Sequence, residues 1–287
     1  MSYAEAIRKT PSEVTPETVQ AMHRLFAPAH LSRTYQAPVI SRDLAYGTDE
    51  RHRLDVHRGA ETSESSPVLL FVHGGGFIAG EKRTEGSPYY DHVGGWAAER
   101  GFVGVTVNYR LAPAHPWPSG SQDVAAAVEW IRDNITAHGG DPERIVVAGH
   151  SAGASHVAGY LAGHGGTPPH VAAAVLLSGI YTLRDAERNP LLRAYYGGDP
   201  ALYEAREPLA GLVESGLPVL YGVAEYDPPD FQEQAAAVIA AHFARHGAVP
   251  AFAHVQGHHH ISEIVSLGID EPALGVTLEH FIRRSTS

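Results

Sequence analysis

The chain has no cysteine among its 287 residues, which excludes disulfide bonds and a thiol nucleophile. No apolar run approaches the roughly 18 residues that a membrane-spanning helix needs. The first ten residues lack the hydrophobic segment of a secretory signal, so we expect a cytoplasmic location. Positive charge is scarce as well, because the net charge is −11. This charge argues against nucleic acid or an anionic membrane as a partner.

The residues that are present indicate one large globular α/β domain spanning 1–287. Hydrophobic residues make up 44% of the chain and charged residues only 18%, a composition typical of a packed core. Short β-branched runs alternate with helical patterns, which predicts parallel strands flanked by helices. An alternating pattern over 43–46 and 51–57 predicts an antiparallel hairpin at the start of the sheet. The later runs fall at 67–72, 101–108, 144–148 and 171–177 for strands, and 124–135 and 275–284 for helices.

Two segments outside this alternation bear on a binding site. Residues 1–35 contain Thr15 and Pro16 at the start of an amphipathic helix, which either covers the mouth of a site or braces the core. Residues 181–215 carry several tyrosines and leucines among prolines and charges. This insertion predicts a small cap over an apolar pocket, with a surface helical segment as the alternative.

The most informative motif is Gly149-His150-Ser151-Ala152-Gly153, which lies between a β-branched run and a stretch of small residues. Glycines two positions before and after Ser151 permit a sharp turn from strand to helix, with the hydroxyl exposed. The motif therefore predicts a nucleophile elbow, with Ser151 as the nucleophile.

A second motif, His73-Gly74-Gly75-Gly76-Phe77, follows the strand predicted at 67–72. Acyl transfer places negative charge on a carbonyl oxygen, and preorganised N–H groups must stabilise it. Residues without side chains let the backbone approach a substrate closely. We therefore expect the N–H groups of Gly75, Gly76 and Ala152 to form an oxyanion hole.

Together these motifs resemble the hormone-sensitive-lipase-like carboxylesterases of the α/β-hydrolase fold. The segments 108–113 and 141–145 resemble further parts of that family. The resemblance implies a mostly parallel sheet with helices on both faces and a small helical cap. The chain departs from the family at His150, where an acidic residue is usual, and at Ala154 and Ala114, where glycine and glutamate are common. The Gly-His-Ser-Ala-Gly-Ala form is closer to arylformamidases, which tend to carry an aromatic residue at the position of Gly76.

A serine nucleophile needs a base and an acid, which follow it in that fold in the order Ser, Asp or Glu, His. Three carboxylates lie after the strand predicted at 217–224. Asp227 precedes a proline that keeps its backbone extended, and it matches the Asp-Pro of the resembling family. Glu225 and Asp230 are the alternatives, and Asp230 also suits a cap of the following helix.

The base lies among three adjacent histidines, His258, His259 and His260. An imidazole titrates near neutral pH and has one nitrogen for the serine proton and another for the acid. The family's histidine precedes an apolar residue, which favours His260 over His258 and His259. Adjacent side chains point in different directions, so we expect no metal here, and no cofactor elsewhere.

The predicted activity is that of a serine carboxylester hydrolase acting on short to medium chain or aryl esters through Ser151, His260 and Asp227. An arylformamidase-like amidase or a lactonase with the same residues is the nearer alternative. A non-catalytic binding protein on this fold is the more distant alternative. The expected partner is a small-molecule ester, and a homodimer remains open.

Overall fold

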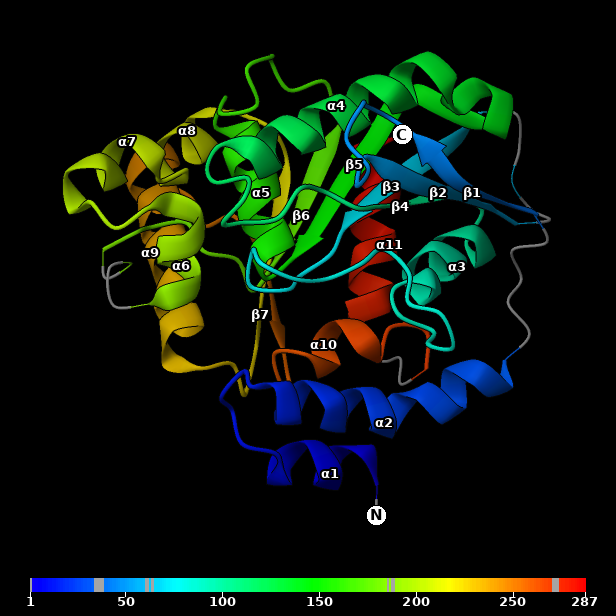
Figure 1. Ribbon diagram of the computed structural model, residues 1–287, viewed down its shortest axis with the longest axis horizontal. Helices are drawn as coiled ribbons and strands as arrows, with labels where there is room; N and C mark the ends of the chain where they lie inside the picture. Colours follow the sequence, from blue (N-terminus) through cyan, green and yellow to red (C-terminus); the bar gives the residue numbers. More distant parts are fainter. Residues whose placement is uncertain are drawn as a thin grey trace.

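Eight strands form one sheet in the computed structural model, which describes residues 2–33, 39–59, 62, 65–184, 186, 189–269 and 274–287. The strand order is β1-β2-β4-β3-β5-β6-β7-β8 (Figure 1). The first two strands form the predicted antiparallel hairpin, and all pairings from β4 to β8 are parallel. The strands are β1 (Val39–Ala45), β2 (Arg53–Arg58), β3 (Ser66–Val72), β4 (Val103–Val107), β5 (Gly140–His150), β6 (Ala173–Leu177), β7 (Val219–Ala224) and β8 (Ala251–Val255).

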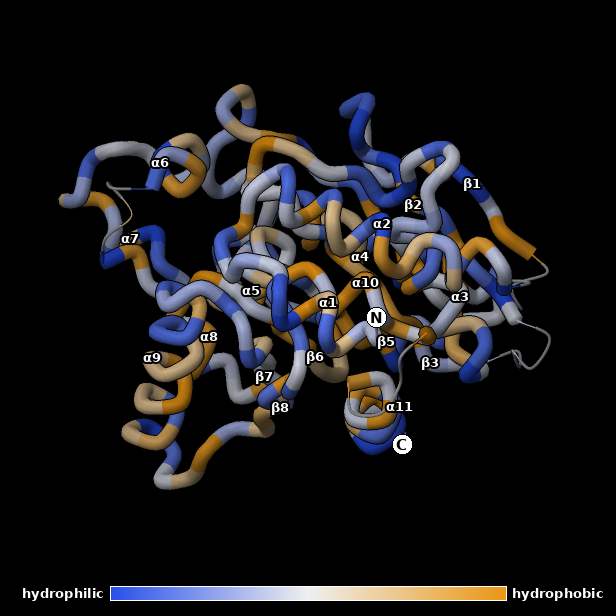
Figure 2. The backbone as a smooth tube through the Cα atoms, turned by 90° about the horizontal axis from the view of Figure 1, so that it is seen from below, coloured by the Kyte–Doolittle hydropathy of each residue, from blue (hydrophilic) through white to orange (hydrophobic). Residues whose placement is uncertain are grey.

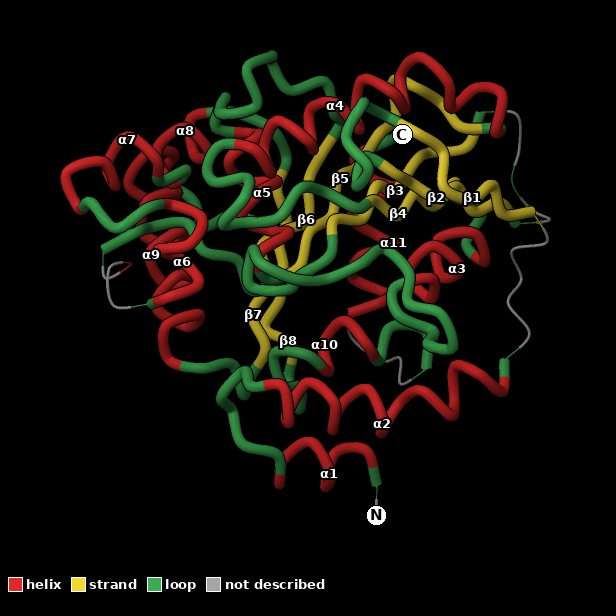
Figure 3. Tube along the Cα trace, viewed as in Figure 1, coloured by secondary structure: helices red, strands yellow, loops and turns green. Residues whose placement is uncertain are grey.

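Helices surround the sheet, whose strands occupy the centre of the molecule (Figure 3). The α-helices are α1 (Tyr3–Lys9), α2 (Pro16–Ser32), α3 (Asp91–Glu99), α4 (Ser119–Asn134), α5 (Ala152–Leu161), α6 (Pro190–Tyr196), α7 (Tyr203–Arg206), α8 (Leu209–Glu214), α9 (Pro229–His246), α10 (Ser262–Val265) and α11 (Leu274–Ser285). Short 3₁₀ helices span Ile135–His138 and Pro200–Leu202. No helix within the described ranges is both long enough and apolar enough to cross a bilayer.

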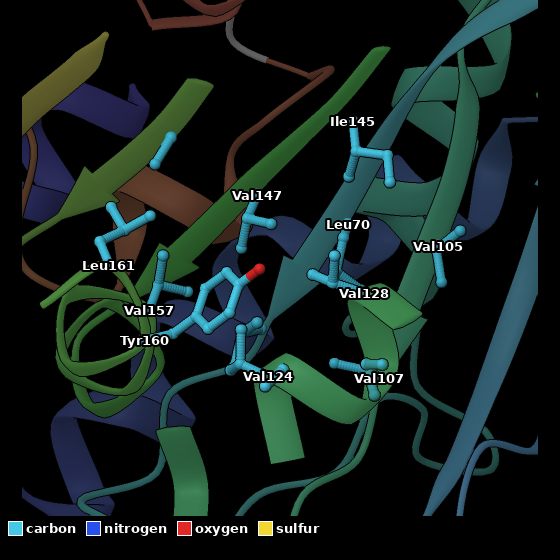
Figure 4. Close-up of a cluster of buried hydrophobic side chains, with 14 of the residues drawn as sticks. Leu70, Val105, Val107, Val124, Val128, Ile145, Val147, Val157, Tyr160 and Leu161 are labelled. Atoms are coloured by element: carbon cyan, nitrogen blue, oxygen red, sulfur yellow. The ribbon is translucent and has the colours of Figure 1, made fainter. Parts of the chain in front are cut away.

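Both faces of the central strands are buried, so these strands read as continuous apolar runs. Leu70 and Val147 point toward α4 and α5, where they pack against Val128 and Val157 (Figure 4). Their neighbours Leu69 and Val146 face the opposite side, together with residues from α3, α11 and α2. Side chains alternate along a strand, and the two hydrophobic layers follow from this alternation.

The N-terminal segment packs against the core. Met22 and Phe26 of α2 and Ile7 of α1 are buried in the second hydrophobic layer. Helix α2 passes beside α10, the short helix after the three histidines, and α1 packs against α2 (Figure 2). Of the two roles considered for this segment, bracing the core is the one these contacts support. Helix α1 lies within 1–35, which we expected to be a helical segment, although the sequence pattern placed only the helix that begins near Pro16.

Helix α4 begins at Ser119, five residues before the predicted start at residue 124. Its first turn, Ser119-Gly120-Ser121-Gln122, has no apolar periodicity, so the pattern underestimated the helix. Small residues are needed there because α4 packs closely on α5. A Cβ atom on Gly120 would lie 2.2 Å from Nδ1 of His156.

Candidate active site

The predicted nucleophile lies at a strained turn between β5 and α5. Ser151 has φ 55° and ψ −122°, a backbone conformation that non-glycine residues rarely adopt. Strand β5 ends at His150 and α5 starts at Ala152, as expected for a nucleophile elbow. Gly153 allows α5 to approach β3, because a Cβ atom there would lie 2.1 Å from the carbonyl oxygen of Val72.

The glycine-rich segment lies directly against this elbow. A Cβ atom on Gly74 would be 3.2 Å from Cβ of Ser151. Gly75 has φ +135° and Gly76 has φ +60°, and a Cβ atom on Gly75 would lie 1.9 Å from the carbonyl oxygen of Ala79. Within the described ranges, the N–H groups of Gly75, Gly76 and Ala152 donate no hydrogen bond. These three donors remain available for an oxyanion.

His73 anchors the glycine-rich segment. Its Nδ1 is 2.6 Å from the carbonyl oxygen of Gly74, and the hydroxyl of Tyr109 donates to the His73 carbonyl oxygen at 2.8 Å. Burial lowers the pKa of His73 to about 4, so its imidazole is neutral at physiological pH. We therefore assign His73 a structural role.

The predicted base and acid meet in the interior. Nδ1 of His260 lies 2.6 Å from Oδ1 of Asp227, and both residues are buried. Burial opposes ionisation of Asp227. The hydrogen bond and charge of His260, together with hydrogen bonds from Ser178 and the Ala224 N–H, outweigh burial and lower the pKa of Asp227. An ionised Asp227 holds the His260 proton on Nδ1 and leaves Nε2 as an acceptor.

Nε2 of His260 is buried and has no hydrogen-bond partner within the described part of the chain, Ser151 included. The His260 ring lies 4.2 Å from the ring of Phe231 and 4.9 Å from that of His150. Nε2 of His150 also lies 2.8 Å from the carbonyl oxygen of His260. The residue preceding Ser151 thus contacts the base directly, although no hydrogen bond joins Ser151 to His260.

The alternative acids and bases have other partners. Glu225 accepts the N–H of Gly257 at 2.6 Å, and Asp230 is exposed in the first turn of α9. Nδ1 of His258 lies 3.3 Å from the Ser262 hydroxyl. Among the described residues, the side chains that hydrogen-bond to Asp227 are those of His260 and Ser178.

His259 has a different partner again, since its Nε2 is 2.7 Å from the carbonyl oxygen of Pro11. The three adjacent imidazoles therefore point to three different parts of the molecule.

Two groups of side chains have the spacing of possible metal ligands. His150, His260 and Glu263 present ligand atoms within 4.8 Å of one another, as do Asp55, His57 and Asp91. Each side chain of the first group has one atom in a hydrogen bond, with Asp227, Ser178 or the backbone, and a second atom without a partner in the described ranges.

Three residues near the acid and the base were not predicted as part of the site: Ser178, Glu263 and His150. The Ser178 hydroxyl lies between Asp227 and Glu263, 2.6 Å from a carboxyl oxygen of each, and His150 is beside Glu263. Ser178 directly follows β6, the strand between β5 and β7. Its place after a strand neighbouring those of Ser151 and Asp227 was the available signal. Glu263 lies three residues after His260, in the short helix α10 that follows the base.

A small cap covers the glycine-rich segment. Phe77 and Ala152 share a hydrophobic cluster with Tyr195, Tyr196 and Leu183. The cap comprises α6, α7 and the 3₁₀ helix between them, within the predicted range 181–215, of which residues 185, 187 and 188 lie outside the described ranges. Helix α8, at the end of that range, packs against α9 and α5 instead. A Cβ atom on Gly76 would lie 2.8 Å from a methyl group of Leu191 in α6. The cap therefore borders the predicted oxyanion hole.

Comparison with known proteins gives a consistent assignment. Residues 69–260 match a family model described as the alpha/beta hydrolase fold. The chain is 30% identical over 249 residues to the esterase LipQ of Mycobacterium tuberculosis, covering 78% of this chain and 58% of LipQ. It is 43% identical over 110 residues to the carboxylesterase NlhH of the same species, covering 38% of this chain and 33% of NlhH. The matches thus span less than two thirds of these relatives' lengths.

Solved structures have the same fold. Esterase LipW from Mycobacterium marinum superposes with a TM-score of 0.69 at 22% identity, covering 99% of this chain and 93% of LipW. A truncated carbohydrate esterase from gut microbiota gives a TM-score of 0.73 at 19% identity, covering 88% of this chain and 98% of that one. At these identities the likeness concerns the fold.

Proposed function

Because this chain belongs to the alpha/beta-hydrolase fold family, we propose that it is a serine carboxylesterase acting through Ser151, His260 and Asp227. The observation that carries the proposal is the hydrogen bond from His260 to Asp227, which leaves the Nε2 atom of His260 unpartnered within the described ranges. The next residue after His150, whose ring contacts His260, is the strained Ser151. Relatives named esterase and carboxylesterase support the same activity.

In the proposed reaction, Oγ of Ser151 attacks the ester carbonyl carbon and passes its proton to Nε2 of His260. The carbonyl oxygen becomes an oxyanion that accepts hydrogen bonds from the N–H groups of Gly75, Gly76 and Ala152. His260 then gives its proton to the departing alkoxide. Water hydrolyses the acyl-enzyme by the same steps, with His260 as the base.

We propose short to medium chain or aryl esters as substrates. The aromatic cap cluster reaches Ala152, so an apolar acyl or aryl group bound at the oxyanion hole would lie beside it. The Gly-His-Ser-Ala-Gly-Ala elbow keeps a formamide or lactone substrate as the second candidate.

The test is hydrolysis of p-nitrophenyl esters from acetate to palmitate, with N-formylkynurenine and a simple lactone alongside. We expect turnover of short esters, and a loss of about 10⁴-fold or more in Ser151→Ala. Ser32→Ala, a change at an exposed serine of α2, is the matched control. Activity of Ser151→Ala within tenfold of the unsubstituted protein would refute the nucleophile. Rapid opening of the formamide or lactone with weak ester turnover would favour the second candidate.

A further inference from the structure

The acid of the proposed site belongs to a chain of buried polar groups. The Ser178 hydroxyl lies 2.6 Å from Oδ2 of Asp227 and 2.6 Å from Oε1 of Glu263. Ser178, Asp227 and Glu263 are exposed by only 2%, 6% and 1%. Two carboxyl groups are therefore bridged by a single hydroxyl in a region from which water is largely excluded.

Counting protons shows that both carboxyl groups cannot be ionised in this arrangement. A hydroxyl has one proton, and an ionised carboxylate can only accept a hydrogen bond. If Ser178 donates to one carboxylate, its oxygen faces the other at 2.6 Å with no proton between them. Such a contact is repulsive unless that second carboxyl group itself carries a proton.

The proton belongs on Glu263 rather than on Asp227. Asp227 accepts hydrogen bonds from His260, Ser178 and the Ala224 N–H, and three donors favour the ionised form of this carboxyl. The Oε2 atom of Glu263, by contrast, is buried without a partner in the described part of the chain. A buried carboxylate with an unpartnered oxygen costs far more free energy than a buried neutral acid with one.

His150 does not supply a compensating positive charge. Its Nε2 is 2.8 Å from the carbonyl oxygen of His260 and 3.3 Å from Oε1 of Glu263, so a proton on Nε2 is well placed to be donated. Its Nδ1 is buried and has no acceptor within the described ranges. A doubly protonated ring would leave that second N–H unsatisfied, so the geometry favours neutral His150.

We infer that Glu263 is a positioning residue held as a neutral carboxylic acid, which donates to Ser178 so that Ser178 donates to Asp227. The inference rests on the proposed function, in which Asp227 orients His260. These two hydrogen bonds, from Glu263 to Ser178 and from Ser178 to Asp227, form a relay. The relay fixes the plane of the Asp227 carboxylate and keeps Glu263 from adding a second negative charge beside the base. Glu263 lies in α10, which begins two residues after His260, so its contact with Ser178 also holds the loop of the base against the end of β6.

Infrared spectroscopy tests the proton directly and needs no catalytic activity. The difference spectrum between the unsubstituted protein and Glu263→Gln at neutral pH should contain the C=O stretch of a protonated carboxylic acid. Glu129→Gln, which removes a half-buried carboxylate from α4, is the matched control and should not remove that band. Absence of the band from the unsubstituted protein would overturn the inference. A band in a protein that hydrolyses no ester would refute the proposed function instead.

Kinetics test the positioning role. Glutamine offers an N–H donor to Ser178 and carries no charge, so Glu263→Gln should retain kcat within about threefold, with the acidic limb of its pH profile unmoved. Glu263→Leu and Ser178→Ala lose the relay, and kcat should fall about 10- to 100-fold with KM little changed. A shift of the limb in Glu263→Gln to lower pH by about half a unit or more would overturn the inference, since it means that a negative charge was removed. If Glu263→Leu does not fold, Glu263→Gln and the infrared band still decide the question.

Discussion

Gly153→Ala tests whether the distance between α5 and the glycine-rich segment controls the proposed reaction. The new Cβ atom would lie 2.1 Å from the carbonyl oxygen of Val72 and 2.5 Å from that of His73. Real Cβ atoms essentially never approach other heavy atoms closer than 3.0 Å, so the elbow must move by about 0.9 Å. Both oxygens belong to backbone, and no side-chain rotation relieves the clash.

The size of this displacement sets the expected effect. An oxyanion hole needs its donors about 2.7–3.1 Å from the developing charge, and a misplacement of about 1 Å costs on the order of 100-fold. We therefore expect kcat/KM for the preferred ester to fall about 100-fold in Gly153→Ala. The overpacking should also reduce the free energy of unfolding by about 1–3 kcal/mol.

The matched control is Gly159→Ala on the same helix. Its Cβ atom would meet Oγ of Ser121 at 2.3 Å, but that hydroxyl belongs to a side chain that can rotate. Alanine also favours a helix interior over glycine. Activity in Gly159→Ala should stay within about threefold, measured together with urea denaturation of both variants. Gly153→Ala with kcat/KM within threefold of the unsubstituted protein and unchanged stability would refute the reasoning.

Two further predictions concern ionisable groups. Asp227→Asn keeps the shape of the side chain but permits the wrong tautomer of His260. We therefore expect kcat to fall about 10⁴-fold with KM nearly constant. A loss of kcat below tenfold in steady-state assays would exclude Asp227 as the acid. Burial lowers the pKa of His156 to about 3, so the folded protein keeps this ring neutral while the unfolded chain protonates it below about pH 6.5. Its contribution to stability is complete above pH 6.5 and is lost as the pH falls toward 3, by about 1.4 kcal/mol per unit. His156→Phe should remove that part of the slope in urea titrations between about pH 7 and 5, and an unchanged slope would contradict the assignment.

The sequence was sufficient for the parts of the molecule that depend on local patterns. Alternating residues predicted the β1–β2 hairpin, and apolar runs predicted the parallel strands. The elbow at Ser151 follows from glycines close in sequence. Local patterns alone could not identify Asp227 and His260, because three carboxylates were candidates for the acid and three histidines for the base. The pattern of the resembling family selected one of each. The structure then places these two residues 2.6 Å apart.

Long-range pairing explains what the sequence did not reveal. Ser178 is 85 residues from Glu263 along the chain, and only the order of strands brings them together. The helix α1 lies far from any motif, and its single buried residue, Ile7, gives no periodic signal. At the start of α4, small residues replaced the apolar pattern because another helix lies too close for larger side chains.

The position of Ser178 has a consequence for how the cap can vary. Ser151, Ser178, Asp227 and His260 follow four adjacent strands, β5 to β8, at one edge of the sheet. Neighbouring strands lie about 4.8 Å apart whatever connects them, because backbone hydrogen bonds set that spacing. The cap emerges from the connection between β6 and β7, after Ser178 and before Asp227. Exchanging that connection would alter which molecules are admitted without altering the spacing of the strands that carry the four polar residues.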